Sequence, residues 1–199
     1  MNEKRTFDVL FSLLGIIFLL PLFLIITLLL KFDSNGPVIY KQIRVGLNLN
    51  NFELYKFRTM FIDSDKKGLL TVGNRDIRIT RLGYWLRKYK IDELPQLFNI
   101  LKGEMSFVGP RPEVLKYVQL YDSYQRRVLT VKPGITDWAS IYFINENQLL
   151  ENLEDPESYY INTIIPEKVN HNLHYIDHHN LWIDLKIISF TIKRILIRV

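Results

Sequence analysis

The chain has 199 residues, which is enough for one catalytic domain plus a membrane element and too few for two full Rossmann-type domains. Its net charge of +5 and its pI of about 9.3 indicate anionic partners, either phosphorylated small molecules, acidic lipid headgroups or nucleic acid. Because the chain has no cysteine, disulfides, thiolate metal sites and a cysteine nucleophile are excluded.

The first predicted element is an apolar segment. Residues 9–30 contain no charged side chain, and a bilayer-spanning helix requires about 20 predominantly apolar residues. Leu28, Leu29 and Leu30 are not followed by the small-residue cleavage site of a secretory signal peptide. We therefore expect a membrane helix that stays attached to the chain.

Basic residues flank both ends of this segment. Lys4 and Arg5 precede it and Lys31 closes it, and basic flanks favour the cytoplasmic side of a membrane. Pro21 removes a helical hydrogen bond and clashes with the preceding turn, which predicts a break into two arms. Neither arm alone crosses a hydrocarbon core of about 30 Å. The segment is therefore either a re-entrant helix with both ends on one face or a spanning helix with a tolerated kink.

The remaining residues predict an α+β fold dominated by helices. In chain order we expect a hairpin of two strands at 37–42 and 52–57, a polar loop at 62–76, helices at 80–89 and 94–101, a rigid link at 109–112 and a helix at 113–129. The link is rigid because each of its prolines disfavours helical geometry in the residue before it. Polar loops of this kind often close over a substrate.

The C-terminal residues also have membrane-like character. Apolar residues fall on one helical face and cations border them, namely Leu181, Leu185, Ile188, Ile192, Ile195 and Val199 beside Lys186, Lys193, Arg194 and Arg198. This composition is typical of an amphipathic helix lying in the headgroup region. A terminal helix that packs on the domain core with solvated lysines would show the same pattern.

Positive charge is concentrated in the middle of the sequence. Residues 56–111 contain twelve Lys and Arg against six Asp and Glu, a local excess larger than the net charge of the whole chain. The planar guanidinium group of arginine suits bidentate contact with phosphate oxygens. The candidate phosphate-binding residues are Lys56, Arg58, Arg78, Arg81 and Arg111. Taken singly, each of them could equally line a solvated face or an anionic membrane surface.

Two adjacent carboxylates, Asp92 and Glu93, stand at the expected start of a helix. Asp is a favoured N-cap residue and acids in a first turn offset the helix dipole, so the pair can be explained as a cap. In the functional interpretation, one carboxylate attacks phosphorus while the other assists in metal binding or proton handling. Surrounding arginines and a bound Mg²⁺ would let an anionic nucleophile approach a diphosphate.

A second pair of carboxylates offers a competing interpretation. Asp63 and Asp65 form the DxD pattern with which many nucleotide-sugar transferases hold a divalent metal. An enzyme of that kind would transfer a sugar without its phosphate. A third possibility is a noncatalytic membrane adaptor whose basic surface holds acidic lipids.

The run KIDELPQLFNILKGEMSFVGPRP at residues 90–112 closely resembles the bacterial monotopic phosphoglycosyl transferases, also called bacterial sugar transferases. Matching motifs occur in the same order along essentially the whole chain: KRTFD at 4–8, GP at 36–37, KFRTM at 56–60, RITRLG at 78–83, KPGIT at 132–136 and LWIDLK at 181–186. The chain resembles the minimal catalytic form, without the additional transmembrane helices and nucleotide-binding-like domain of larger relatives.

This resemblance implies a re-entrant membrane helix over residues 1–35 and a catalytic domain over residues 36–199. The domain would lie on the cytoplasmic face of the bacterial inner membrane, with amphipathic helices in the interface. Asp92 would attack the β-phosphorus of a UDP-sugar and release UMP, and undecaprenyl phosphate would then take the phosphosugar from the aspartate. Glu93 and Mg²⁺ would support this chemistry, with Asp92 and Glu93 as metal ligands.

The same resemblance makes UDP-sugar, undecaprenyl phosphate and membrane lipids the expected partners, and nucleic acid is not expected. A homo-oligomer and association with downstream glycosyl transferases stay open.

Two positions depart from the pattern of many relatives. Leu20 rather than Ser precedes Pro21, so a serine-assisted kink is not available. Asp137 follows the KPGIT motif where many relatives have Gly, and the segment that begins there and ends near Asn152 also differs. We expect this segment to influence the choice of sugar, although it does not identify the sugar.

Overall fold

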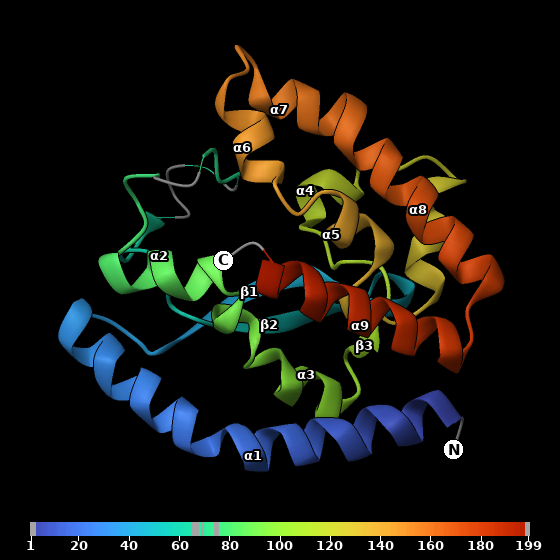
Figure 1. Cartoon of the computed structure of the whole chain (residues 1–199). Coiled ribbons are helices and arrows are strands. Elements are labelled where there is room, and N and C mark those ends of the chain that lie inside the picture. Colours follow the sequence, from blue (N-terminus) through green and yellow to red (C-terminus); the bar gives the residue numbers. More distant parts are fainter. Residues whose placement is uncertain (1–2, 65–67, 69, 74–75, 198–199) are drawn as a thin grey trace.

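A long N-terminal helix runs along one side of a smaller mixed domain (Figure 1). The structure is a computed structural model that describes residues 3–64, 68, 70–73 and 76–197. It confirms the helix-dominated α+β fold. The elements are α1 (Glu3–Asp33), β1 (Ile39–Val45), η1 (Leu47–Leu49), β2 (Asn51–Phe57), α2 (Arg81–Lys88), η3 (Ile91–Glu93), α3 (Gln96–Lys102), β3 (Ser106–Val108), α4 (Leu115–Val118), η4 (Gln125–Thr130), β4 (Gly134–Thr136), α5 (Trp138–Tyr142), α6 (Glu146–Glu151), α7 (Pro156–Tyr159), η5 (Tyr160–Ile164), α8 (Ile165–His178) and α9 (Leu181–Ile197).

Helix α1 is continuous through Pro21 and bends gradually in Figure 1. The expected break into two separate arms is therefore wrong: proline loosens the helix here without ending it. Its most apolar window has a mean hydropathy of 3.1, and only 17% of that window is buried. Large apolar side chains such as Phe18 and Leu28 are exposed along it. By length and composition, α1 could cross a membrane.

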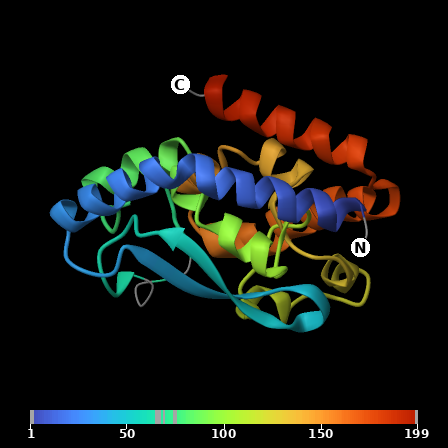
Figure 2. The same ribbon diagram turned by 90° about the horizontal axis from the view of Figure 1, so that it is seen from below.

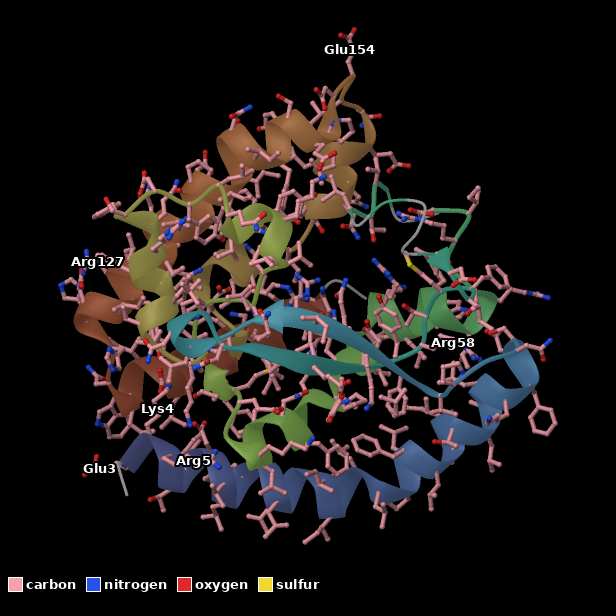
Figure 3. The ribbon with its side chains drawn as sticks, turned by 180° about the vertical axis from the view of Figure 1, so that it is seen from behind. Glu3, Lys4, Arg5, Arg58, Arg127 and Glu154 are labelled. Atoms are coloured by element: carbon pink, nitrogen blue, oxygen red, sulfur yellow. The ribbon has the colours of Figure 1, made fainter. Side chains whose placement is uncertain are left out.

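Both ends of α1 contact the same domain. Near its N-terminus, Arg5 donates hydrogen bonds to the carbonyl oxygens of Ile100 at 2.6 Å and Leu101 at 2.9 Å, at the end of α3. Near its C-terminus, Arg58 Nη2 donates to the carbonyl oxygens of Leu30 at 3.0 Å and Ser34 at 2.6 Å. Figure 3 shows Lys4 and Arg5 at one end of α1 and Arg58 at the other. The whole helix therefore lies along the domain.

Polar contacts also join α1 to α8 and α9. Lys4 forms an ion pair with Asp184 of α9 and donates to the hydroxyl of Tyr175 in α8 at 3.1 Å. Tyr175 in turn donates to Asp184 at 2.5 Å. Asp8 accepts hydrogen bonds from Ser106 Oγ at 3.0 Å and from the Phe107 amide at 3.1 Å. The first and last helices of the described chain thus meet at a buried polar cluster.

The β1–β2 hairpin confirms the predicted pair of strands. The strands are antiparallel with Ile39 opposite Phe57 and Val45 opposite Asn51, so β1 extends further than expected. Phe57 packs with Phe23 and Leu30 of α1, and with Leu86 of α2. The alternation of strand side chains therefore places one face of the hairpin against α1.

A short parallel pair, β3 and β4, was not predicted. Ser106 lies opposite Gly134, and Val108 lies opposite Thr136. The chains approach so closely that a Cβ atom on Gly134 would lie 2.2 Å from the amide nitrogen of Gly109. Glycine is needed here because a side chain would separate the two segments.

The predicted helix over residues 113–129 is wrong. It is replaced by α4 and, after a turn, by the 3-10 helix η4. Asp122 Oδ1 accepts from the Gln125 amide at 2.7 Å, and Gln125 Oε1 accepts from the Asp122 amide at 3.0 Å. This reciprocal pairing is that of a capping box, which starts a new helix and so ends the preceding one.

Helix α9 was correctly predicted, and part of its expected apolar stripe is exposed. Asp184 and Ile187 are buried against the domain, whereas Leu185 and Ile192 of the expected stripe are exposed. Exposed apolar side chains at Trp182, Phe190 and Leu196 extend the outer surface of the helix. Seen from below, α1 crosses the domain between the β1–β2 hairpin on one side and α9 on the other (Figure 2).

Candidate active site

One cleft of about 1210 Å³ contains most of the predicted site residues. Its walls come from α1, the hairpin, α2, η3, the 109–112 link, α5, α6, α8 and α9. Segments that are far apart in the sequence therefore meet around one space. Asp92 and Glu93 lie in its lining.

The two carboxylates lie in the 3-10 turn η3 between α2 and α3. Lys90, which immediately precedes this turn, has a left-handed backbone with φ of 57°, a conformation uncommon for a residue with a side chain. Strained backbone of this kind often occurs at functional sites. Neither η3 nor α3 has a side-chain cap, so the pair does not cap a helix through a hydrogen bond, although both carboxylates lie in the first turn of η3.

Glu93 is buried between two cations. Its Oε1 accepts from Lys56 Nζ at 3.1 Å and from Arg111 Nη2 at 2.5 Å, and its Oε2 accepts from Arg111 Nη1 at 3.2 Å. Burial alone would raise the pKa of Glu93, but the charges of Arg111, Lys56 and Lys90 outweigh it and hold this pKa well below its usual range. Glu93 therefore stays ionised and keeps two cations beside its neighbour.

Asp92 has different surroundings. It is buried, and its Oδ1 atom has no hydrogen-bond partner among the described residues. Burial, followed by the charge of Glu93, raises the pKa of Asp92, while Lys56, Lys90 and Arg87 lower it. A carboxylate oxygen without partners, surrounded by cations in a cleft, can attack an electrophile such as a phosphorus atom.

Lys56 lies at the base of the cleft. Burial lowers its pKa to about 8, although the charge of Glu93 opposes this effect. A lysine in this state is charged at neutral pH and is poised to lose its charge in mildly alkaline solution.

The 109–112 link places Arg111 over the dyad. The Arg111 amide donates to Asp137 Oδ2 at 3.1 Å, and Asp137 Oδ1 accepts from the Ser140 amide at 2.5 Å as the N-cap of α5. The departure at position 137 thus has a structural result: its carboxylate joins the start of α5 to the backbone of Arg111.

Of the other three predicted arginines, two make contacts within the protein and one lies outside the cleft. Arg58 lines the cleft, but its Nη2 caps α1 while Nε and Nη1 have no partner among the described residues. Arg78 also lines the cleft, where it pairs with Asp76 and donates to the carbonyl oxygens of Gly68 at 2.6 Å and Leu70 at 2.7 Å. Arg81 is exposed on α2 outside the cleft. Substrate contact by these three arginines stays a prediction.

Sequence reasoning missed several residues of the cleft. Arg87, Lys88 and Lys90 line it beside the dyad, and their nearness to Asp92 in the sequence was an available signal. The opposite end is lined by Arg44, Glu113, Glu146, Tyr160 and Lys168. Glu113 directly follows the motif at residues 90–112, whereas the other four come from separate elements that no local motif connects.

The carboxylates match a magnesium site in part. Mg²⁺ in enzymes is commonly held by one or two carboxylates together with substrate phosphates. Asp92 Oδ1 suits such an ion, whereas both oxygens of Glu93 already accept hydrogen bonds. Within the described part of the chain, no three carboxylate or imidazole groups come together as a metal site. Asp63 lines the cleft, and Asp65 lies outside the described residues.

The cleft also has an apolar wall. Phe11, Gly15 and Leu19 of α1 line it together with Ile188 and Ile192 of α9. These residues belong to the two helices with exposed apolar surfaces. A ligand with a charged head and a long apolar tail could therefore reach Asp92 from the side of α1.

The model of the family described as bacterial sugar transferase matches residues 1–198. The chain belongs to the bacterial sugar transferase family. Undecaprenyl-phosphate glucose phosphotransferase of Komagataeibacter xylinus is 40% identical over 98% of this chain and 36% of its own length. UDP-N-acetylgalactosamine-undecaprenyl-phosphate N-acetylgalactosaminephosphotransferase of Aeromonas hydrophila is 38% identical over 97% of this chain and 43% of its own length.

The chain thus spans less than half the length of these two relatives. An uncharacterized sugar transferase of Bacillus subtilis (strain 168) is closer in size, with 41% identity over 99% of this chain and 89% of its own length. The names of the first two relatives specify different sugars at similar identity. Overall similarity therefore identifies the family without identifying a sugar.

Proposed function

We propose that this chain transfers a sugar 1-phosphate from a UDP-sugar to undecaprenyl phosphate. The observation that carries the proposal is the cleft itself. It joins a carboxylate whose Oδ1 atom has no partner among the described residues, and which lies among cations, to the apolar surfaces of α1 and α9. A soluble diphosphate and a lipid phosphate need these two kinds of surface. The names of the relatives, which specify undecaprenyl-phosphate sugar phosphotransferases, support the same reaction.

In the first step, an Asp92 oxygen attacks the β-phosphorus of the UDP-sugar. The bond between that phosphorus and the bridging oxygen breaks, UMP leaves with the electron pair, and an acyl phosphate that joins Asp92 to the phosphosugar remains. In the second step, a phosphate oxygen of the lipid attacks the same phosphorus. Asp92 leaves as a free carboxylate, and the product is undecaprenyl diphosphosugar. Covalent catalysis of this kind divides one displacement between two anions into two steps.

The cations around the dyad make both steps possible. Lys56 and Arg111 contact Glu93 in the substrate-free enzyme and can move their hydrogen bonds to phosphate oxygens when the donor binds. Arg87, Lys88 and Lys90 extend this positive surface along the cleft. Glu93 therefore positions the cations, and Asp92 is left as the nucleophile.

Mg²⁺ is proposed as the cofactor. Asp92 would hold it through its unpartnered oxygen, and Glu93 would join as a ligand once Lys56 and Arg111 have moved their hydrogen bonds to the donor phosphates. When bound, the ion would neutralise charge on the diphosphate and on the leaving UMP. The cationic side chains of the cleft, such as Lys56 and Arg111, would supply part of the same neutralisation.

The docking of both ends of α1 supports a re-entrant, monotopic arrangement. Arg5 and Arg58 fix opposite ends of the helix on the same domain, so both ends belong on the same side of a bilayer. The basic flanks favour the cytoplasmic side of the inner membrane. There the enzyme would carry out the first membrane step of a bacterial glycan, followed by downstream glycosyl transferases.

The test is a covalent adduct on Asp92. Incubation with UDP-sugar and Mg²⁺ but without lipid should release UMP and add the mass of one sugar phosphate to the peptide that contains Asp92. Asp92→Asn should abolish both the adduct and turnover. Glu93→Gln should slow the reaction and still allow the adduct. Peptide sequencing by mass spectrometry measures all three outcomes.

The products also separate the competing mechanisms. A metal-dependent glycosyl transferase would release UDP rather than UMP, and a noncatalytic adaptor would release neither. An adduct on a residue other than Asp92, or UMP release that always requires the lipid, contradicts the assigned nucleophile.

A further inference from the structure

The end of the cleft opposite α2 differs in charge from the dyad end. Around the dyad, Lys56, Arg87, Lys88, Lys90 and Arg111 outnumber the carboxylates. At the opposite end, the cleft is lined by two cations, Arg44 and Lys168, and two carboxylates, Glu113 and Glu146. The first end suits a diphosphate, and the second suits a neutral group with many hydroxyls.

The charges at this second end are arranged in buried pairs. Arg44 Nη1 lies 3.0 Å from Glu113 Oε1, and Tyr160 donates to Glu113 Oε2 at 2.6 Å. Lys168 forms an ion pair with Glu146, and its Nζ lies 5.0 Å from the centre of the Tyr160 ring. Both members of the Lys168–Glu146 pair are mostly buried. Glu146 therefore has a defined position at the first turn of α6.

This end is close to the phosphate end. The pKa of Arg111 is raised first by Glu93, and the charges of Asp137 and Glu146 add to the effect. The contacts agree with this: the Arg111 amide donates to Asp137, the N-cap of α5, and the Glu146 amide donates at 3.0 Å to the carbonyl oxygen of Phe143, which ends α5. The short helix α5 therefore joins the dyad end of the cleft to α6. A group attached to a phosphate at the dyad would extend toward α6.

Polar side chains without partners line the cleft beside Glu146. The side chains of Asn145, Asn147 and Gln148 have no hydrogen bond or ion pair with the rest of the described chain, and all three face the cleft. The backbone of Asn147 also accepts from the Gly73 amide at 2.9 Å, so the polar loop meets α6 at this point. The arrangement offers one carboxylate and three amides to a ligand.

We propose that the first turn of α6, with Glu146 at its centre, is the subsite that recognises the sugar hydroxyls of the donor. The inference rests on the proposed transfer from a UDP-sugar. Carboxylates and amides accept and donate the hydrogen bonds that hydroxyl groups need. The uracil base is better matched to the other end, where the rings of Tyr84 and Tyr89 line the cleft among cations.

The test compares Glu146→Gln and Gln148→Ala with wild-type enzyme in a membrane mimetic, using UDP-hexoses and UDP-N-acetylhexosamines. Glu146→Gln should lower kcat/KM for the preferred donor by about 10- to 100-fold, as expected for the loss of one hydrogen bond to a charged group. The ratio of kcat/KM between donors should change in both variants. The inhibition constant of UMP should change by no more than about twofold, because UMP has no hexose to occupy this subsite and an altered charge away from its own contacts has little effect on its binding.

Glu154→Gln is the matched control, since Glu154 is exposed at the far tip of the molecule (Figure 3) and should leave every donor unchanged. Equal losses for all donors and for UMP, or donor ratios unchanged in both variants, would overturn the subsite. Melting temperatures show whether each variant folds. If Glu146→Gln does not fold, the donor ratios of Gln148→Ala test the subsite instead. Wild-type enzyme that releases no UMP from any donor would instead refute the proposed function.

Discussion

Neighbouring carboxylates behave differently in this site because their contacts differ. Glu93 accepts three hydrogen bonds from cations, which keeps its pKa low, whereas Asp92 has an unpartnered oxygen and a raised pKa. Pairs of titratable groups whose surroundings separate their pKa values commonly divide the chemical roles between them. The family resemblance already assigned the attack to Asp92 and a supporting role to Glu93, and the three-dimensional contacts add a physical reason for the proposed difference between the two residues.

Lys56 provides a test based on pH. Its pKa of about 8 means that the side chain is charged below that pH and neutral above it. A neutral amine binds phosphate less well, so KM for the UDP-sugar should rise as the pH increases through about 8. Lys56→Arg keeps the charge at every accessible pH and should flatten this alkaline rise. Steady-state kinetics between pH 6.5 and pH 9.5, roughly 1.5 units either side of the pKa, measure the effect.

Lys41→Arg is the control for this experiment because Lys41 pairs with Glu53 on the exposed surface of the hairpin and does not line the cleft. It should preserve the wild-type profile. The same alkaline rise in wild type and Lys56→Arg would exclude Lys56 as its cause.

The residues that could be predicted from sequence are those within continuous motifs. Lys56, Asp92, Glu93 and Arg111 belong to two such motifs and meet in the cleft. The pattern could not show that Arg58 caps α1, because an arginine that binds phosphate and one that binds carbonyl oxygens look alike in sequence.

At the scale of elements, regular patterns gave reliable predictions and short segments did not. The hairpin and α2 have clear alternation or helical spacing. By contrast, β3 and β4 have three residues each, too few to show a period, and they pair only because two glycines allow close approach. The break after α4 depends on the capping pair of Asp122 and Gln125, which helical spacing of apolar residues does not detect.

The contact between α1 and α9 can be tested through stability. Asp184 is buried and pairs with Lys4 and Tyr175, so Asp184→Asn removes one partner of a buried charge pair. We expect the free energy of unfolding to fall by about 1.5–3 kcal/mol, the usual value of a hydrogen bond to a charged group, because the Lys4 side chain left behind is 26% exposed and can be hydrated. Thermal unfolding in detergent or nanodiscs, followed by circular dichroism, measures this change.

An exposed ion pair gives the comparison. Asp177→Asn removes the partner of Arg127, and both side chains of that pair are more than two-fifths exposed. Asp177→Asn should lower the free energy of unfolding by about 0–1 kcal/mol, as for other ion pairs on a protein surface. Similar destabilisation by the two variants would mean that the buried cluster does not hold the two helices together.

The membrane arrangement is a property of the whole molecule. The sequence was compatible with a spanning or a re-entrant helix, because the apolar segment and its flanking charges do not show what each end of the helix contacts. The structure adds that both ends of α1 bind the same domain. It cannot extend away from that domain to the far side of a bilayer without losing one set of contacts.

Topology can be measured with single cysteines, since the chain has none of its own. Glu3→Cys and Asn35→Cys each place a thiol at one end of α1, at exposed positions. In intact cells, both should resist a membrane-impermeant thiol reagent, and both should react after lysis. Labelling of only one of them in intact cells would demonstrate a spanning helix. Pro21→Ala should favour a straight helix and raise the fraction of molecules that span.

The cluster of Lys4, Tyr175 and Asp184 also sets an order of events during biosynthesis. Lys4 and Asp184 are 180 residues apart, so a ribosome that adds 5–20 residues per second needs roughly 10 to 40 s to make the second partner after the first. During that interval α1 has already left the ribosome, and its large apolar side chains are exposed to water. We therefore expect α1 to enter the membrane before α9 can dock on it, with insertion preceding completion of the cleft.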